Sequence, residues 1–382
     1  MLPHRSNGLD NLRALAIALV FMYHYMVFVS GEPTFGWASS VGWVGVDLFF
    51  VLSGYLIGNQ LFAGLAERHA LSLSRFYARR ALRTWPVFWL VLAAYFIFPS
   101  AMGGKPPPSL WKFLTFTQNY QLQPGTAFSH AWSLCIEEQF YLVLPLVVLL
   151  AVKVGSRRLQ AWLLLMTLLA VGIATRWVLW SEYGLEAGGK GNGYYPNVYY
   201  ATLGRFDEFL PGIAVALVKN YHPLRWQRLM ARGVALFGVG LAATVAVLYG
   251  VLYHYYIDGY GYPFFMSVFG YSLVAMAFSL LVASALSPHS PLQRIKIPGA
   301  YSVALWSYSI YLTHKPVGFV LKGYLAPYGL QQPAQVLVIA AASIAVGAVL
   351  CRLVELPFMQ LRDRGVPSLF RPVPTYPHAQ KA

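Results

Sequence analysis

Long apolar runs separated by short polar connections dominate this chain. The runs measure roughly 17 to 24 residues, so each can cross a hydrocarbon core of about 30 Å as a helix. The pattern predicts an all-α integral membrane protein with about ten transmembrane helices. We expect these helices at 12–29, 42–62, 81–98, 134–153, 161–180, 204–219, 233–253, 263–286, 301–320 and 333–353.

The connections between these spans alternate between basic and non-basic. Cytoplasmic loops of membrane proteins carry an excess of Lys and Arg. The alternation therefore predicts that both termini are cytoplasmic, that residues 1–355 form a single transmembrane domain, and that 356–382 is a poorly ordered cytoplasmic tail. The basic residues cluster before the first span, in 63–83, 153–158, 219–232 and 287–300, and after 352, whereas 30–41 and 254–262 contain none.

Composition agrees with a membrane protein and excludes other classes. Of the 382 residues, 58% are hydrophobic and only 11% are charged, which is less than half the charge of a typical soluble domain. The net charge of +15 follows the topology, so it does not indicate nucleic-acid binding. Cys135 and Cys351 are expected near opposite membrane faces and should not form a disulfide. No spacing of Cys or His indicates a metal site.

Ionisable side chains at membrane depth are costly, and each is a candidate for function. Arg13 and His24 lie eleven residues apart on the first predicted helix, which is about three turns and roughly 16 Å. They should therefore share a face at different depths. Arg13 could instead be a snorkelling anchor, and His24 a hydrogen-bonded core histidine.

Other predicted helices place titratable groups at a depth similar to that of His24. A hydrated cavity would explain so many convergent groups, although an Arg205 ion pair with Asp207 or Glu208 that braces two helices is an alternative. The groups are Asp47, Glu137, Glu138, Arg205, Asp207, Glu208 and His314.

Seven motifs in order along the chain resemble those of the acyltransferase-3 family of membrane-bound O-acyltransferases. The resemblance covers nearly the whole sequence. The motifs are Arg13 with His24, the run from Gly45 to Gly54, the run from Arg75 to Pro86, Trp132-Ser133-Leu134 with Glu137, Arg205 to Gly212, Ser307-Tyr308 to His314, and Glu355-Leu356-Pro357.

The resemblance implies a multi-pass enzyme of the bacterial cytoplasmic (inner) membrane with ten helices. Such an enzyme moves an acyl group, most often acetyl, from acyl-CoA to a hydroxyl of a surface polysaccharide, lipopolysaccharide or peptidoglycan. Some members acylate macrolides or other small molecules. Members acting on peptidoglycan often carry an additional extracytoplasmic domain, which would here be supplied in trans. The expected partners are acyl-CoA, a glycan acceptor and membrane lipid, and homo-oligomerisation stays open.

The chemistry assigns roles to the candidates. His24 suits the base that takes the hydroxyl proton, because imidazole titrates near neutral pH. A carboxylate on its other ring nitrogen would fix the tautomer, and Glu137 and Asp47 are both candidates. His314 completes the expected catalytic set. Guanidinium groups bind phosphate well, so Arg13, Arg75, Arg79, Arg80 and Arg83 are expected to bind coenzyme A, and Trp132, Arg205, Asp207, Tyr308 and Tyr311 to bind substrate.

Two other classes of function are alternatives to an acyltransferase. In a proton-coupled transporter or flippase, His24, Glu137, Asp207 and His314 would form a substrate or proton pathway. Transporters often show two-fold internal repeats, and this sequence shows none. In a non-catalytic scaffold the polar residues would be internal bracing, and replacing His24 by Gln would leave function intact.

Overall fold

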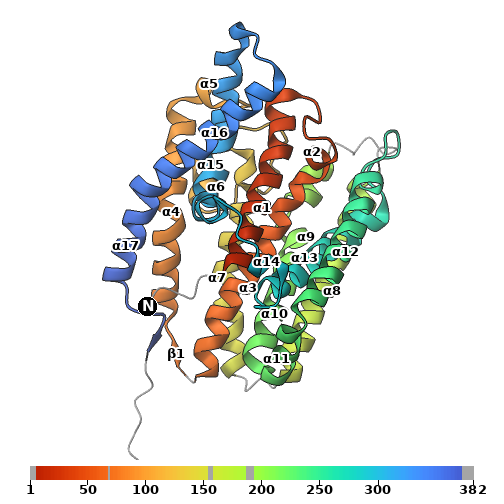
Figure 1. Cartoon of the computed structure of the whole chain (residues 1–382), viewed down its shortest axis with the longest axis vertical. Coiled ribbons are helices and arrows are strands. Elements are labelled where there is room, and N and C mark those ends of the chain that lie inside the picture. The colour runs from red at the N-terminus through yellow and green to blue at the C-terminus, as the bar shows by residue number, and fades with distance from the viewer. Residues whose placement is uncertain (1–5, 68, 154–157, 186–192, 372–382) are drawn as a thin grey trace, which may run out of the picture.

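The computed structural model describes residues 6–67, 69–153, 158–185 and 193–371, and nearly all of this chain is helical (Figure 1). The first half contains α1 (Asn7–Tyr25), a π-helical turn at Met26–Ser30, α2 (Trp37–Val41), α3 (Gly45–Ala66), β1 (Ala70–Leu71), α4 (Leu73–Ile97), α5 (Pro99–Met102), α6 (Leu110–Leu114) and α7 (Trp132–Lys153). The second half contains α8 (Arg158–Tyr183), α9 (Thr202–Arg205), α10 (Leu210–Tyr221), α11 (Pro223–Ala231), α12 (Gly233–His254), α13 (Tyr271–Ala285), α14 (Pro291–Arg294), α15 (Ala300–Leu325), α16 (Gln332–Leu350), α17 (Leu356–Gly365) and β2 (Phe370–Arg371).

Every predicted span coincides with helical chain. In the part of the chain that the structure describes, seven helical segments are long and apolar enough to cross a membrane: Asn7–Ser30, Trp37–Ala66, Ser129–Lys153, Arg158–Tyr183, Gly233–His254, Met266–Ala285 and Gln332–Gly365. The other three predicted spans fall on α4, α10 and α15. Helix α4 carries four arginines, α10 has only 12 residues, and α15 contains His314, Lys315 and Lys322. The count of about ten spans and the side of the termini stay predictions.

The predicted sidedness of the loops matches the two ends of the molecule. The loops that contain α2 and α5, and the turns after α12 and α15, lie at one end in Figure 1, whereas α11 and the β1–β2 pair lie at the other. The first group was expected on the outer side and the second in the cytoplasm. Two of the basic connections, 63–83 and 219–232, thus lie at the end of the molecule opposite the loops expected on the outer side.

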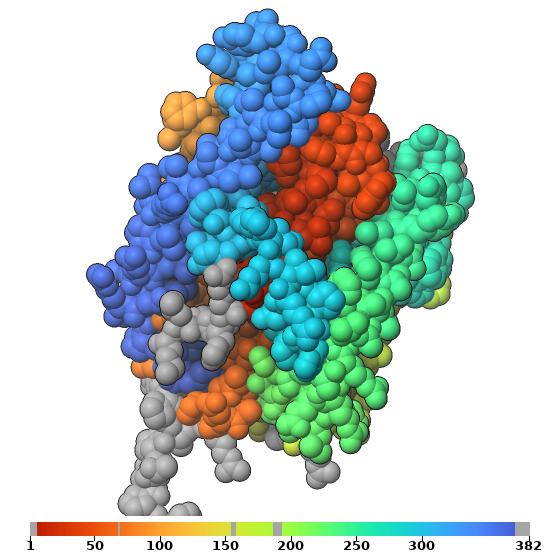
Figure 2. Space-filling view, in the orientation of Figure 1, coloured from red at the N-terminus to blue at the C-terminus, as the bar shows by residue number. Residues whose placement is uncertain are grey.

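Helix α3 lies at the centre of the bundle. It packs against α1, α10 and α13, while α15 packs against α1 and α16. Close approach to α10 depends on Gly54 and Gly212, because a Cβ at Gly54 would collide with the carbonyl oxygen of Phe209, and one at Gly212 with that of Val51. Helices α8, α12 and α16 are mostly exposed at the periphery, as lipid-facing helices are. Figure 2 shows α16 and α17 on one side of the molecular surface and α12 on the other.

A buried arginine joins three segments of the second half. Arg176 of α8 is fully buried and forms two hydrogen bonds to the carboxylate of Asp207, of 2.6 and 2.9 Å. It also donates to the carbonyl oxygens of Val268 and Gly204. The hydroxyl of Ser272 on α13 donates to the same carboxylate at 2.6 Å. This arginine was not among the residues singled out in the sequence.

A second buried arginine joins α9 to α3. Arg205 pairs with Glu208 and, at 3.2 Å, with Asp47. Its guanidinium group also lies over aromatic rings, 5.0 Å from the centroid of Trp132 and 4.1 Å from that of Tyr271. Arg205 thus forms the expected pair with Glu208, but that pair is local, and the contact that braces two helices is the one with Asp47. Asp207 pairs with Arg176 instead.

The C-terminal segment folds back onto α4. Arg79 binds Asp363 and the carbonyl oxygen of Val366, both at 2.7 Å, and Arg75 donates to the carbonyl oxygen of Ser368 at 3.2 Å. β1 pairs with β2 in antiparallel register. Residues 356–371 of the expected tail are thus folded, and 372–382 lie outside the described residues. Cys135 and Cys351 are both buried and free.

Replacing Arg176 by Gln should destabilise the bundle, because it leaves the Asp207 carboxylate buried without its charged partner. Breaking a buried ion pair costs about 3–5 kcal/mol. We expect a clearly lower midpoint of thermal unfolding in detergent, whereas Arg228→Gln, at an exposed position of α11, should leave it unchanged. An Arg176→Gln midpoint within about 2 °C of the wild type would contradict the structural role of this pair.

Cysteines at Leu71 and Phe370 should form a disulfide. These residues face each other, and because the Ser72 amide donates to the Leu369 carbonyl, they form a non-hydrogen-bonded pair. Such pairs have Cα atoms about 4.5 Å apart, within disulfide range. In a background with Cys135 and Cys351 replaced by Ala, oxidation should block maleimide labelling of both new thiols. The control Leu71→Cys with Ser368→Cys is diagonal and should cross-link poorly. Equal labelling before and after oxidation would refute this packing.

Candidate functional site

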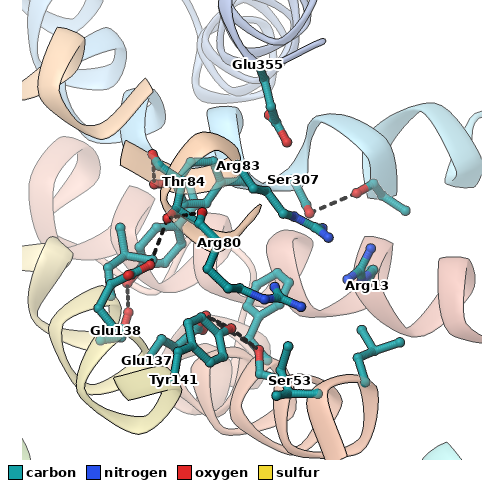
Figure 3. Close-up of a pocket in the computed structure, with 18 of the residues that line it drawn as sticks. Arg13, Ser53, Arg80, Arg83, Thr84, Glu137, Glu138, Tyr141, Ser307 and Glu355 are labelled. Atoms are coloured by element: carbon teal, nitrogen blue, oxygen red, sulfur yellow. Dashed lines mark hydrogen bonds between the residues drawn. The ribbon is translucent and has the colours of Figure 1, made fainter. Parts of the chain in front are cut away.

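A cavity of about 520 Å³ lies between α1, α3, α4, α7 and α15. Its polar lining comes from all five helices and from the turn that precedes α17, and Figure 3 shows these side chains converging on a common space. These polar residues are Arg13, Ser53, Asn59, Gln60, Arg80, Arg83, Thr84, Ser133, Glu137, Glu138, Tyr141, Ser307, Tyr308, Tyr311 and Glu355.

Three of the predicted donor-binding arginines line this cavity. Arg13 and Arg83 have no hydrogen-bond or ion-pair partner among the described residues. Arg80 makes a long contact of 3.4 Å with Gln60 and lies over the ring of Tyr141 at 5.1 Å. Glu137, Glu138 and Glu355 line the same cavity, but within the described chain none of them forms an ion pair with these arginines. The guanidinium groups are thus free to bind an anion, and their planar donor set suits phosphate. The geometry therefore offers an anion-binding site.

Arg75 and Arg79 do not contribute to this site. Both lie on the first turns of α4 but point to the C-terminal segment, where Arg79 is neutralised by Asp363. Helical spacing does not predict this division, since Arg79 and Arg83 are four residues apart and neighbours on one helix face are three or four residues apart. Of the arginines predicted to bind coenzyme A, some line the cavity, whereas Arg75 and Arg79 hold the C-terminal segment against α4.

Glu137 is held inside the cavity wall by neutral donors. It accepts a hydrogen bond of 2.7 Å from the Tyr141 hydroxyl and a weaker one of 3.4 Å from Ser53. The Tyr141 hydroxyl also lies 3.1 Å from Ser53. Tyr141 follows Glu137 by one helical turn, so this partner could have been found in the sequence from the i,i+4 spacing on α7.

Two further carboxylates are fixed in the same way. Glu138 accepts from the Thr84 hydroxyl at 2.8 Å and from the Trp85 indole at 3.1 Å, which joins α7 to α4. Glu355 accepts from the Ser309 hydroxyl at 2.9 Å. Neutral donors satisfy these carboxylates, and among the described residues no carboxylate forms an ion pair with a cavity arginine.

Two histidines of the expected catalytic set, His24 and His314, are directly hydrogen-bonded. Nδ1 of His24 lies 2.6 Å from Nε2 of His314, and the ring planes are nearly parallel, at 8°. Nδ1 of His314 lies 3.0 Å from the carbonyl oxygen of Ile310. The expectation that Glu137 or Asp47 would pair with His24 is therefore not met, because Glu137 binds Tyr141 and Asp47 binds Arg205.

A third histidine and a lysine adjoin this pair. The ring centroid of His130 is 6.0 Å from that of His24 and 5.5 Å from that of His314. Lys315 donates to the Thr126 carbonyl oxygen at 3.1 Å and is buried. Within the described chain no group of His, Cys, Asp or Glu has the arrangement of a metal site. The cluster thus consists of basic side chains.

Tyr311 lies between the cavity and the histidine pair. It lines the cavity, its hydroxyl donates to the carbonyl oxygen of His130 at 2.6 Å, and it lies 2.7 Å from the hydroxyl of Ser133. Its ring centroid is 5.9 Å from that of His314, one turn further along α15. The cavity therefore ends within about one helical turn of the histidines.

The predicted substrate-binding residues fall into two groups. Tyr308 and Tyr311 line the cavity, and the Tyr308 hydroxyl donates to the Thr84 carbonyl oxygen at 2.8 Å. Trp132, Arg205 and Asp207 instead belong to the buried ion-pair network described above, away from the cavity lining.

Comparison with known proteins gives a family for this chain. A family model described as an acyltransferase domain matches residues 6–352. Peptidoglycan O-acetyltransferase OatA of Listeria monocytogenes is 29% identical over 329 residues, which cover 81% of this chain and 49% of that protein. Putative peptidoglycan O-acetyltransferase YrhL of Bacillus subtilis is 30% identical, covering 81% of this chain and 48% of that protein.

A third relative, O-acetyltransferase OatA of Staphylococcus aureus, is 24% identical over 348 residues, with 84% of this chain and 52% of that protein covered. The chain thus spans about half the length of these curated relatives. No solved structure matches it. Since the family model covers nearly the whole chain, including the helices that form the cavity and the histidine pair, the protein belongs to the acyltransferase-3 family.

Proposed function

We propose that this protein transfers an acyl group, with acetyl as first choice, from cytoplasmic acyl-CoA to a hydroxyl of a surface glycan. The main support is a cavity that contains two arginines without an ion-pair partner among the described residues. This cavity ends one helical turn from a hydrogen-bonded histidine pair. The names of the relatives, peptidoglycan O-acetyltransferases, support a glycan as the acceptor and acetyl as the group.

The donor assignment rests on charge and length. Coenzyme A carries its phosphates at one end and its thioester at the other, joined by the pantetheine arm. In this proposal Arg13, Arg80 and Arg83 bind the phosphates. Arg13 and His24 are separated by roughly 16 Å along α1, which is comparable with an extended pantetheine arm, so the thioester would reach the histidine pair.

The reaction needs one proton transfer in each direction. His24 takes the proton of the acceptor hydroxyl as its oxygen attacks the thioester carbonyl. When the tetrahedral intermediate collapses, the carbon–sulfur bond breaks and the thiolate takes the proton from His24. The products are an acylated hydroxyl and coenzyme A as its thiol, and the base returns to its starting state.

The proposed direction follows from the charge pattern. The end of the molecule with α11 and the β1–β2 pair carries the basic connections 63–83 and 219–232, which favours a cytoplasmic position of this end, with the protein in the bacterial inner membrane. The histidine pair lies further toward the opposite end, where an extracytoplasmic acceptor would arrive. Donor and acceptor would then meet within the protein from opposite sides of the membrane.

Replacing His24 by Ala should abolish transfer while the protein remains folded. General-base catalysis contributes about 10²- to 10⁴-fold to rate, so we expect a loss of that size. The assay follows radiolabel from acetyl-CoA into peptidoglycan oligosaccharides and release of coenzyme A, with protein in lipid nanodiscs. His254→Gln, at the exposed end of α12, is the matched control. If the wild-type protein neither bound acetyl-CoA nor released coenzyme A, the donor assignment would be refuted.

Replacing Arg83 by Gln should weaken donor binding selectively. A hydrogen bond to a charged group contributes about 1.5–3 kcal/mol, so KM for acetyl-CoA should rise roughly 10- to 100-fold. S-acetylpantetheine lacks the nucleotide phosphates, and its KM should not change. The control Arg228→Gln should behave as wild type with both donors. An equal rise in KM for both donors would show that Arg83 does not bind phosphate.

A further inference from the structure

The helix backbone determines which nitrogen of His314 carries the proton. A carbonyl oxygen can only accept, so the 3.0 Å contact with Ile310 requires a proton on Nδ1 of His314. A second proton on Nε2 would make the ring cationic, buried one residue from Lys315. Burying such a charge without a counter-ion is costly. His314 is therefore neutral, and its Nε2 is an acceptor.

The same reasoning extends to His24. Since Nε2 of His314 accepts, the 2.6 Å contact makes Nδ1 of His24 the donor. A neutral His24 with its proton on Nδ1 has a bare Nε2. The groups around it are His314 from α15, His130 from the turn before α7, and the rings of Tyr23 and Phe28 on its own helical segment. Among the described residues no carboxylate contacts this ring.

We infer that His314 is a positioning residue that fixes His24 in the Nδ1–H tautomer and aims its bare Nε2 as the base. The assignment of the base rests on the proposed function, but the tautomer does not. His314 takes the place that a carboxylate has in hydrolase triads. It acts through His24 and need not touch either substrate.

A neutral partner suits this depth in the membrane. A carboxylate beside His24 would place a charge in an apolar region before any substrate arrives, at high cost. The His24–His314 pair orients the base with no net charge. When His24 takes the hydroxyl proton, its Nδ1–H bond to His314 becomes charge-assisted and therefore stronger. The stabilisation thus develops only as the reaction proceeds.

The tautomer can be measured without any substrate. The full-length protein is labelled with ¹⁵N-histidine, and solid-state NMR in lipid distinguishes protonated from bare ring nitrogens. The His24 signals are those lost in His24→Gln, out of nine histidines. We expect the Nδ1–H tautomer in wild type and a mixture of tautomers in His314→Leu. An Nε2–H tautomer or an imidazolium in wild type would overturn the inference.

Kinetics test the positioning role separately. His314→Leu removes the acceptor and should lower kcat by about 10²- to 10³-fold with KM for acetyl-CoA nearly unchanged. His314→Gln retains an acceptor oxygen and should recover at least tenfold of that loss. If both variants kept wild-type kcat, or both lost it equally, the positioning role would fall. If instead His24→Ala kept full activity while the tautomer was as expected, the proposed function would fail and the tautomer would stand.

Discussion

Every charge inside an apolar bundle must find a partner, and this constraint organises the whole molecule. Arg176 with Asp207 and Arg205 with Glu208 and Asp47 are fully buried and paired. Arg176–Asp207 and Arg205–Asp47 connect segments far apart in the sequence, so these ion pairs and their hydrogen bonds set how α3, α8, α9 and α13 are placed relative to one another. Breaking one would leave a buried charge, which costs more than the pair itself contributes.

The same constraint separates structural charges from functional ones. Arg13 and Arg83 lie in the cavity with no partner among the described residues, while the carboxylates nearby are satisfied by hydroxyl and indole donors. Arg176 and Arg205 are ion-paired, whereas in the part of the chain that the structure describes the cavity arginines form no ion pair, although Glu137, Glu138 and Glu355 line the same cavity. These guanidinium groups are therefore the ones available to bind an anion. The cavity arginines, and not the ion-paired ones, are therefore the residues proposed to bind the donor phosphates.

Apolar length and basic alternation were sufficient to predict the helices, because both follow from the cost of burying backbone and charge in lipid. They could not predict pairing, which depends on how each helix is rotated about its axis. Asp47 and Glu137 were equal candidates for the partner of His24, yet Asp47 lies on the face of α3 toward Arg205, and Glu137 is one turn from Tyr141. Arg176 was missed because it stands alone in a long apolar run, and its partner Asp207 is far away in sequence.

Two helices connect the two ends of the proposed path. Helices α1 and α15 pack together, and each contributes residues to both the cavity and the histidine pair: Arg13 and His24 from α1, and Ser307, Tyr311 and His314 from α15. The positions on α15 are spaced by four and three residues, so they lie along one face.

Because each helix is continuous over this stretch, the distance from the arginines to the base is set by helical rise and cannot change independently at either end. A fixed distance suits one long donor molecule that bridges both sites. A carrier that alternates between membrane sides would need the two sites to move relative to each other, and the continuous helices oppose such motion.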